Sequence, residues 1–482
     1  MTTPTDTQPV PTLDRLDADG IEAIHDTSME IIEEIGIQVN HDRALQTLEE
    51  HGASVDAERI VTADRELIED AVDDAPSSFT LHGRGPDTDL DIGAGDILRA
   101  PGYGPPNIVT HAEGRRNSQL ADFEVLLKLA HEEDVINCAG YNLCEPNDVD
   151  QSVKHVAMLQ RSLTMTDMPI MGSTYGEDRA ETCMELLKLA TDDPDLDRPY
   201  MAGLINTVPP RSLDTRMVGG LVTYAAYGQP TVISSFTMAG ASGPATLAGS
   251  LAQANAENLL GIALTQFVNP GAPVVYGVPS SNIDIRYGSL SIGSAESALF
   301  TSFAGQMGRY YDIPSRGGGS LSDAKTVDYQ AGFESMLTMA VTAFSQVDFV
   351  LHAAGILESY SAISPEKFVL DCELIRTLDR FVEGYPIDEE HFALDVMSSV
   401  DPSGHFLAQR HTLEHAEETF YMPDIIDKRS HGDWEEDGSK TAFELGSERV
   451  DALLASYEAP DIDPDIESAI STLAEEAMAG VE

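Results

Sequence analysis

Residues 200–236 read YMAGLINTVPPRSLDTRMVGGLVTYAAYGQPTVISSF. Within this stretch, residues 200–208 and 230–236 are short and almost continuously apolar, which is typical of strands buried in a parallel sheet. Residues 215–227, between the two runs, read as a helix. A strand, a helix and a second strand in this order make one repeat of an α/β fold. The stretch therefore predicts a parallel βαβ unit.

The same alternation extends in both directions along the chain. Further apolar runs occupy residues 135–141, 169–175, 273–279, 313–319 and 348–355. Further helices are expected at residues 120–131, 178–190, 245–267, 294–310, 329–345 and 365–382. Seven such units in a row, with starts about 30 to 45 residues apart, favour an α/β fold of the (β/α)8 TIM-barrel type. The eighth strand is expected at residues 392–400 or near 404–407.

Segments of different character flank the repeats. The first segment, residues 13–115, is expected to form an N-terminal subdomain. Its predicted helices are at 16–36, 42–51 and 64–74, and its predicted strands are at 79–82, 90–92 and 107–110. We therefore divide the chain into a disordered tail (1–12), this subdomain, a barrel (116–423) and an acidic C-terminal extension (424–482). A helix near 447–457 in the extension is expected to pack on the outside of the barrel or to serve an oligomer contact.

The composition is strongly acidic. The 482 residues include 28 Lys and Arg against 82 Asp and Glu, for a net charge of −54, while 42% of the chain is hydrophobic. Apolar residues in this proportion can build a large core. The charge argues against binding to nucleic acid or to an anionic membrane, because both attract clustered basic residues. The acidic residues are spread along the whole length, so we interpret them as solvation for a halophile's salt-rich cytoplasm.

The cysteine content and the lack of targeting signals also favour the cytoplasm. Four cysteines in this length do not make a disulfide framework, and none has a zinc-ligand spacing. The N-terminus has no signal-peptide pattern and no apolar run is long enough to span a membrane, so we expect a cytoplasmic protein. His411 and His415 are four residues apart and could share a helix face, either as metal ligands or, as we favour, in capping and core hydrogen bonds. We predict no metal site.

Candidate site residues lie where the predicted strands end, because a barrel carries its active site there. No phosphate-binding loop or dinucleotide fingerprint is present, and no nucleophilic triad stands out. The residues at these ends are mainly aromatic or neutral and polar, which suits a methylated cation. They are Tyr141, Asn142, Ser173, Tyr175, Asn206, Ser234, Phe236, Tyr276, Arg316, His352 and Glu358.

Three longer motifs carry a resemblance to a known family. They are TMAGASGPATLAG at residues 237–249, QFVNPGAPVVY at 266–276 and SDAKTVDYQAGFE at 322–334. On these motifs, and over about residues 13–429, the chain resembles the trimethylamine methyltransferase (MttB-like) family of corrinoid-dependent methyltransferases. The resemblance implies a TIM barrel and methyl transfer from a methylated amine to Co(I) of a cobalamin. That cobalamin is carried by a separate small corrinoid-binding protein, so this chain binds no cofactor tightly.

One position separates branches of this family. The founding branch carries pyrrolysine, which aligns at or next to Gln330, and this chain has an ordinary residue there. It therefore resembles the non-pyrrolysine branch, the glycine betaine:corrinoid methyltransferases. A quaternary ammonium needs no activation, because its leaving group is already a neutral tertiary amine. Betaine is also a common osmolyte in salty habitats.

The resemblance implies roles for the candidate residues. His352, Gln330 and Glu334 are the catalytic candidates; the acidic residues around Gln330 could equally form a solvated face. His352 and Arg316 are expected to donate to the substrate carboxylate. The remaining substrate-binding candidates are Tyr141, Tyr175, Phe236 and Tyr276 as an aromatic cage, with Asn142 and Asn206 beside them.

Alternatives stay open at this point. The donor could be trimethylamine, carnitine, proline betaine or choline, and the chain could be a catalytically inactive barrel that binds corrinoid proteins. A lyase or aldolase would need a Schiff-base lysine or a metal, and of the seven lysines only Lys325 lies just beyond a predicted strand end. The family also implies a homo-oligomer and a place in methanogenesis-related methyl metabolism.

Overall fold

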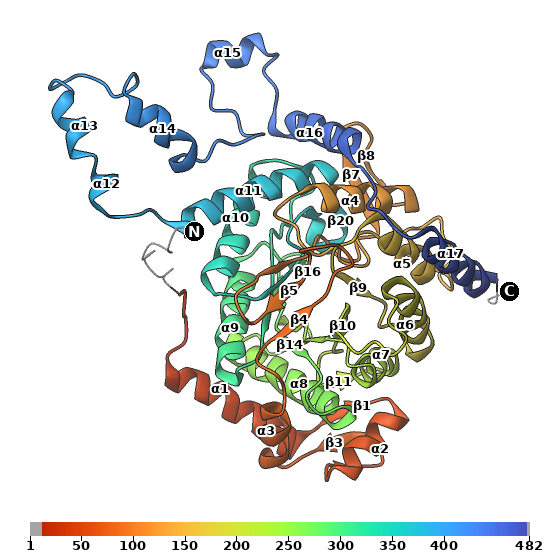
Figure 1. Ribbon diagram of the computed structural model, residues 1–482. Coiled ribbons are helices and arrows are strands. Elements are labelled where there is room, and N and C mark those ends of the chain that lie inside the picture. Colours follow the sequence, from red (N-terminus) through yellow and green to blue (C-terminus); the bar gives the residue numbers. More distant parts are fainter. Residues whose placement is uncertain (1–11, 480–482) are drawn as a thin grey trace.

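A parallel sheet occupies the centre of the molecule, which is a computed structural model that describes residues 12–479 (Figure 1). The strands run side by side in the order β6, β18, β17, β14, β12, β10, β9, and every neighbouring pair is parallel. Their bounds are β6 (Leu98–Arg99), β9 (Ile170–Gly172), β10 (Met201–Asn206), β12 (Thr231–Ser234), β14 (Val274–Gly277), β17 (Ser315–Gly318) and β18 (Phe349–Leu351).

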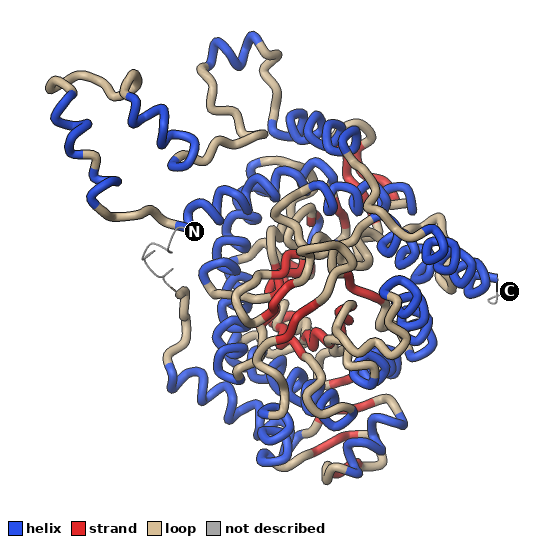
Figure 2. The backbone as a smooth tube through the Cα atoms, viewed as in Figure 1, coloured by secondary structure: helices blue, strands red, loops and turns tan. Residues whose placement is uncertain are grey.

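Helices surround this curled sheet (Figure 2). They are α4 (Leu120–Glu132), α5 (Lys154–Met165), α6 (Glu177–Thr191), α7 (Thr215–Ala226), α8 (Leu247–Val268), α9 (Ala295–Tyr311), α10 (Tyr329–Phe344) and α11 (Pro365–Glu383). All but α5 are confirmed predictions, with ends within two residues. Chains that alternate strand and helix in this way bury both faces of the sheet, which explains the continuously apolar strands.

Residues 137–141 bridge the two outer strands of the sheet. The Cys138 N–H donates to the Arg99 carbonyl at 3.4 Å, beside β6. On the other side the Ala139 N–H donates to the Pro169 carbonyl at 2.9 Å, and the Met171 N–H to the Gly140 carbonyl at 3.0 Å. The predicted eighth strand is wrong in both of its positions, because residues 389–399 form the short helices α12 (Glu389–Phe392) and α13 (Leu394–Ser399) and residues 404–407 form no strand.

The N-terminal part packs beneath α8 and beside α7. It consists of α1 (Ala18–Glu30), the π-helix Ile31–Ile35, β1 (Ile37–Val39), α2 (Asp42–Glu50), β2 (Ser54–Val55), β3 (Ile60–Thr62) and α3 (Arg65–Asp73). Its buried side chains share one hydrophobic cluster with α8, and β1 pairs in parallel with β11 (Ser212–Leu213). The division at residue 115 stays a prediction, but β6 lies before it and belongs to the central sheet.

Smaller sheets lie outside the central sheet. One contains β13 (Met238–Ala239), β15 (Ser281–Asp284) and β16 (Ser289–Ser291); another contains β7 (Asn107–Thr110), β8 (Gly114–Asn117), β19 (Ile356–Leu357) and β20 (Ala362–Ile363); β4 (Phe79–Leu81) and β5 (Leu90–Ile92) form a hairpin. Most of these strands follow the carboxyl ends of central strands, so they help to shape the site described below.

The C-terminal part carries α14 (Arg410–Thr419), α15 (His431–Glu436), α16 (Ala442–Ser456) and α17 (Pro464–Ala479). Val450 and Leu453 of α16 and Ile470 of α17 join the main hydrophobic cluster, so these two helices pack on the body. The predicted helix at 447–457 is thus confirmed within α16. The predicted disordered tail, residues 1–12, lies outside the described residues except for its last one.

Several absences hold for the described residues. No helix within residues 12–479 is long and apolar enough to cross a membrane. All four cysteines are free and buried. In the same range no group of three or more His, Cys, Asp or Glu side chains could hold a metal ion.

The helix α7 approaches the central sheet through a glycine, which gives a test of the fold. A Cβ atom on Gly220 would lie 2.2 Å from the Thr174 carbonyl oxygen, so Gly220→Ala must force backbone apart. We expect it to lower the free energy of unfolding by about 2–3 kcal/mol in denaturant titrations in molar KCl. A Cβ on Gly332, also within a helix, meets nothing within 4 Å, so Gly332→Ala should raise stability by up to about 1 kcal/mol. Equal effects of the two substitutions would contradict this packing.

Candidate active site

Two adjoining cavities open at the carboxyl ends of the central strands. The first, of about 400 Å³, we call the Arg316 cavity; the second, of about 570 Å³, we call the Tyr141 cavity. Both are lined by Tyr103, Leu204 and Asn206, so they share one wall. The Arg316 cavity is further lined by Thr207, Val208, Pro209, Phe236, Met238, Ser242, Pro279, Arg316, His352 and Tyr360.

Strand register brings the polar lining together. Asn206 of β10 is paired with Ser234 of β12, Ser234 with Gly277 of β14, and Gly277 with Arg316 of β17. A Cβ atom on Gly277 would lie 2.5 Å from Ser234 Oγ and 3.2 Å from Arg316 Cδ, so only glycine leaves room for the arginine side chain there. The row therefore delivers one long basic side chain into the space at the strand ends.

Arg316 is a buried cation, and no carboxylate among residues 12–479 pairs with it. Only 2% of the residue is exposed, and neither Nε nor Nη1 has a hydrogen-bond partner among the described residues. Burial lowers the pKa of its guanidinium to about 10, which still leaves it charged at neutral pH. A buried, unpaired charge is costly, and an arginine fork matches the two oxygens of a carboxylate. The Arg316 cavity is therefore built to take an anionic group from outside.

His352 adds a neutral donor beside this cation. Its Nδ1 accepts a hydrogen bond from the Tyr103 N–H at 3.1 Å, so the ring proton is carried on Nε2. Burial, and secondly the Arg316 charge, hold the pKa of His352 well below its usual value. The residue has φ +65°, the left-handed region that non-glycine residues rarely adopt. The tight turn after β18 thus fixes the ring over the cavity.

Aromatic rings form the rest of the wall. The Tyr360 ring lies 4.6 Å from the His352 ring and 5.9 Å from the Phe236 ring, between centroids, and the Phe236 contact is edge to face. Tyr103 approaches from the other side, 6.5 Å from the His352 ring. Burial raises the pKa of Tyr360 to about 12, so its hydroxyl stays protonated. Rings arranged around one space offer their faces to a cation.

The turn that carries Tyr360 is strained and firmly tied. Glu358, Ser359 and Tyr360 have φ of 50°, 54° and 70°, and three left-handed residues in a row persist only when their surroundings hold them. Arg115 of β8 donates to both Glu358 carboxylate oxygens, at 3.0 and 2.9 Å. The Ser359 hydroxyl donates to Asp323 Oδ1 at 2.6 Å. These contacts hold Tyr360 in the cavity wall.

Asp323 and the predicted catalytic residues Glu334 and Gln330 belong to this support. Asp323 also accepts from the N–H groups of Ile292 and Gly293. Its own N–H donates to Glu334 Oε2 at 2.7 Å, and Gln330 Nε2 donates to Glu334 Oε1 at 2.9 Å. Neither Gln330 nor Glu334 lines the two cavities, and Gln330 is exposed at the start of α10. The structure therefore does not bring them to the cavity that holds Arg316 and His352.

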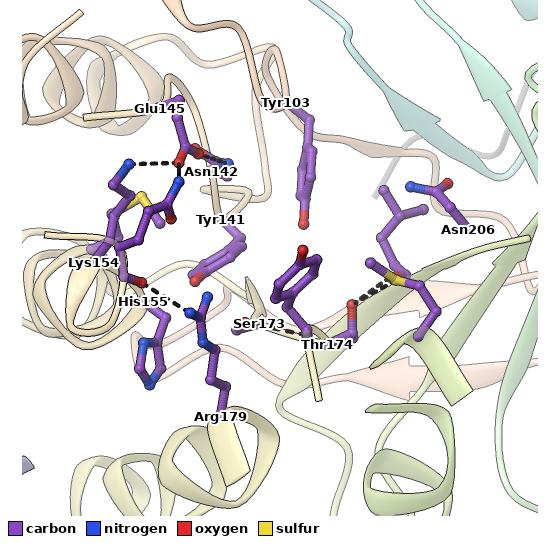
Figure 3. Close-up of a pocket in the computed structure, with 15 residues that line it drawn as sticks. Tyr103, Tyr141, Asn142, Glu145, Lys154, His155, Ser173, Thr174, Arg179 and Asn206 are labelled. Carbon is purple, nitrogen blue, oxygen red and sulfur yellow. Dashed lines mark hydrogen bonds and ion pairs between the residues drawn. The ribbon is translucent and has the colours of Figure 1, made fainter. Parts of the chain in front are cut away.

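The other predicted substrate-binding residues divide between the cavities. Phe236, Arg316 and His352 share the Arg316 cavity, whereas Tyr141, Asn142 and Tyr175 line the Tyr141 cavity and not the Arg316 cavity, and Asn206 lines both. Figure 3 shows the Tyr141 cavity, with Asn142, Glu145 and Lys154 gathered on one side and Asn206 on the other. Lys154 pairs with Glu145 at 2.6 Å, whereas the Asn142 side-chain oxygen has no hydrogen-bond partner among the described residues.

Tyr276 was predicted to belong to the aromatic cage, but it lines neither of the two cavities. It is fully buried on the helix side of β14, and its hydroxyl donates to Asn255 Oδ1 of α8 at 2.7 Å. Side chains alternate between the two faces of a strand, and the inward position at this end of β14 is Gly277. The sequence prediction placed the end of this strand one residue too early. It therefore assigned the outward-facing Tyr276 ring to the cavity.

Tyr103 and Tyr360 were missed by sequence reasoning. Tyr103 follows β6, a strand of two residues inside the segment assigned to the N-terminal subdomain, so no barrel repeat signalled it. Tyr360 lies two residues after Glu358, which does stand among the candidates. The pairing of β6 with β18 is what brings Tyr103 beside His352.

Comparison with known proteins agrees with the motifs. The family model described as trimethylamine methyltransferase (MTTB) matches residues 1–480. The chain belongs to the trimethylamine methyltransferase family. Within it, the chain is 41% identical over 463 residues to the glycine betaine methyltransferase of Desulfitobacterium hafniense, covering 96% of each chain.

Two further members of the trimethylamine methyltransferase family are more distant. The proline betaine:corrinoid methyltransferase of Eubacterium limosum is 30% identical over 457 residues, covering 92% of this chain and 93% of the relative. Trimethylamine methyltransferase MttB2 of Methanosarcina mazei is 32% identical over 269 residues, covering 56% and 54%.

Among solved structures, the chain is similar to the monomethylamine methyltransferase of Methanosarcina barkeri. The TM-score is 0.51 at 11% sequence identity, with 92% of this chain and 89% of the other covered. At this identity the likeness concerns the fold alone.

The protonation of His352 gives a test of the site. Because its folded-state pKa lies below the unfolded value of about 6.5, acid favours the unfolded chain. Stability is therefore retained above about pH 6.5 and lost as the pH falls toward the lowered pKa. We expect the His352 ring signal in NMR, assigned by its loss in His352→Gln, to stay unshifted from about pH 8 to 6. A histidine in a short peptide serves as control; titration of His352 near 6.5 would contradict the burial and the tautomer.

Proposed function

We propose that this chain transfers a methyl group from a small quaternary ammonium carboxylate, glycine betaine, to the cobalt of a corrinoid on a separate small protein. The observation that carries the proposal is the buried guanidinium of Arg316. The chain has 82 acidic residues, yet none of the described ones pairs with this cation. The missing anion is then the carboxylate of the substrate.

The two ends of betaine match the two ends of the Arg316 cavity. Arg316 and the Nε2–H of His352 bind the carboxylate as charged and neutral donors. Tyr103, Phe236 and Tyr360 surround the trimethylammonium with aromatic faces. Trimethylamine and choline lack a carboxylate and would leave Arg316 unpaired, which argues against them as donors. The likeness to the two betaine methyltransferases supports the same substrate class.

For this reaction the protein mainly has to position the substrate. The corrinoid, when its carrier protein docks, supplies the nucleophile that accepts the methyl group. The C–N bond breaks with its electron pair on nitrogen, so dimethylglycine leaves as a neutral amine and no proton donor is required. Because both ends of betaine are held, one of its methyl groups points toward the opening of the Arg316 cavity. The aromatic rings around it exclude water. Tyr103, Leu204 and Asn206, shared by both cavities, would face the incoming acceptor.

We further propose that the central sheet is a closed (β/α)8 barrel with residues 137–141 as the eighth strand. The hydrogen bonds from this segment to residues beside both outer strands support it. In such a barrel the carboxyl ends of the strands meet at one face, which is where the two cavities open.

The first experiment measures betaine binding by calorimetry in molar KCl. Arg316→Met should weaken binding about 100-fold or more, because a buried carboxylate would lose its charged partner. Arg316→Lys should cost less, about tenfold, since it keeps the charge but loses the fork. The matched control is Arg286→Met, an exposed arginine paired with Asp284, which should bind as the unaltered chain does.

Turnover is then measured with free reduced cobalamin as acceptor. Glycine betaine should yield equal amounts of dimethylglycine and methylated corrinoid, whereas trimethylamine and choline should yield neither. Betaine binding without any product would indicate an inactive barrel that only recruits corrinoid proteins. No binding and no product would reject the proposal.

The support under Tyr360 predicts a second kinetic effect. Asp323→Asn replaces an acceptor oxygen by an amide group and disturbs the bond to Ser359, so the Tyr360 ring moves from the ammonium. The ring contacts substrate and transition state alike, so we expect KM for betaine to rise about tenfold with kcat nearly unchanged. Asp284→Asn, at an exposed hairpin, is the control. A fall in kcat alone would assign Asp323 to the chemical step instead.

A further inference from the structure

In the proposed reaction the product forms behind the corrinoid. The cobalt approaches the methyl group in line with the C–N bond, so the amine departs on the side away from the cobalt. The carrier protein therefore covers the opening of the Arg316 cavity at the moment when the product forms. A product that leaves sideways, through a neighbouring cavity, does not have to wait until the carrier dissociates.

Three cavities adjoin in a row. The Arg316 cavity and the Tyr141 cavity share one wall. A third cavity of about 530 Å³, which we call the outer cavity, shares His155, Tyr175 and Arg179 with the Tyr141 cavity. Tyr175 is 40% exposed, so the outer cavity reaches the surface of the molecule. The Tyr141 cavity therefore lies between the substrate and the solvent.

Arg179 is a cation of the Tyr141 cavity that is available to a ligand. Lys154, the other cation of this cavity, is already paired with Glu145 at 2.6 Å. Arg179 Nη2 donates to the Gln151 carbonyl at 3.0 Å, and no carboxylate among the described residues forms an ion pair with it. An arginine fork matches the two oxygens of a carboxylate. The Tyr141 cavity can therefore take an anionic group, as the Arg316 cavity can.

His155 adds an acceptor beside this cation. The residue is only 8% exposed, and its Nδ1 has no hydrogen-bond partner among the described residues. Burial, and secondly the charge of Arg179, lower the pKa of His155 to about 4. The ring is therefore neutral at neutral pH, and one of its two nitrogens is an acceptor. The Asn142 side-chain oxygen is a second acceptor without a partner in the same cavity.

This combination matches the product better than the substrate. Loss of one methyl group leaves a tertiary amine, which takes up a proton from water at neutral pH and then carries one N–H. Dimethylglycine thus offers a carboxylate and an N–H group, whereas betaine offers a carboxylate and no N–H. Figure 3 shows the Arg179 side chain extending from α6 toward the space that His155 and Tyr141 also line. The rings of Tyr103 and Tyr141, 6.3 Å apart between centroids, offer their faces to the methylated ammonium.

We propose, resting on the proposed function, that the Tyr141 cavity is an exit site that binds the demethylated product, dimethylglycine. Arg179 pairs with its carboxylate, and His155 accepts the hydrogen bond of its N–H group. The product crosses the shared wall into this cavity and then leaves through the outer cavity past Tyr175. Arg216, whose guanidinium carbon lies 4.2 Å from the centroid of the Tyr175 ring, offers the carboxylate a further cation on this path.

The test measures dimethylglycine binding by calorimetry in molar KCl, in full chains that carry Arg316→Met so that the substrate cavity does not contribute. This background should still bind dimethylglycine. Adding Arg179→Met should weaken the binding about tenfold or more, because the carboxylate loses its charged partner. The matched control adds Arg198→Met instead. Arg198 stacks on Tyr200 at 5.1 Å, much as Arg179 stacks on Tyr175 at 5.2 Å, but it lines neither cavity, so binding should be unchanged.

A second measurement concerns the N–H group. The Arg316→Met background should bind dimethylglycine about tenfold more tightly than betaine, and adding His155→Phe should abolish this preference, because it removes the acceptor and keeps a ring. A preference that survives His155→Phe would overturn the role of His155.

The outcomes separate the exit site from the proposed function. Dimethylglycine binding that disappears with Arg316→Met alone would overturn the exit site, and so would binding that Arg179→Met weakens no more than Arg198→Met does. Arg179→Met alone should bind betaine as the unaltered chain does. Betaine turnover without any dimethylglycine binding through Arg179 rejects the exit site only, whereas absence of betaine binding to the unaltered chain rejects the proposed function.

Discussion

The uncompensated charge of Arg316 is the constraint on which the site depends. Burying a guanidinium without a counterion opposes folding, and in the proposed function the substrate carboxylate supplies the missing anion. The neighbouring groups are consistent with that purpose. His352 is kept neutral, so it adds a donor without adding a second buried charge. Aromatic rings, which carry no formal charge, complete the wall and suit the cationic end of the same ligand.

The backbone around the cavity also positions the side chains that line it. Gly277 makes room for the arginine stem, and the left-handed residues at His352 and at Glu358–Tyr360 aim two rings at one space. Left-handed residues cost about 1–3 kcal/mol each. Contacts outside the cavity hold them: Arg115 on Glu358, Asp323 on Ser359 and Glu334 on the Asp323 backbone. Residues that never touch a ligand thus decide where Tyr360 stands.

Much of this could be foreseen from the sequence, and the failures have physical causes. Continuous apolar runs such as 200–208 predict central strands well, and the strand ends pointed to Phe236, Arg316 and His352, which line one cavity. The prediction for Tyr276 was wrong because successive side chains of a strand point to opposite faces of the sheet. Tyr276 is one residue before the inward-facing Gly277, so its ring points outward. Tyr103 was missed because β6 is too short to show a pattern. Gln330 and Glu334 came from a motif, and a motif does not reveal whether a residue contacts a ligand or supports the turn beside it.

The acidic surface and the cavity perform separate tasks. Most acidic side chains lie at the surface, whereas we propose that selection among amines takes place in the Arg316 cavity through one arginine, one histidine and three rings. A crystal structure of the chain with glycine betaine tests this account most directly. The account predicts the betaine carboxylate within about 3 Å of the Arg316 guanidinium and the trimethylammonium among Tyr103, Phe236 and Tyr360. Betaine bound in the Tyr141 cavity, or with its carboxylate turned away from Arg316, would contradict it.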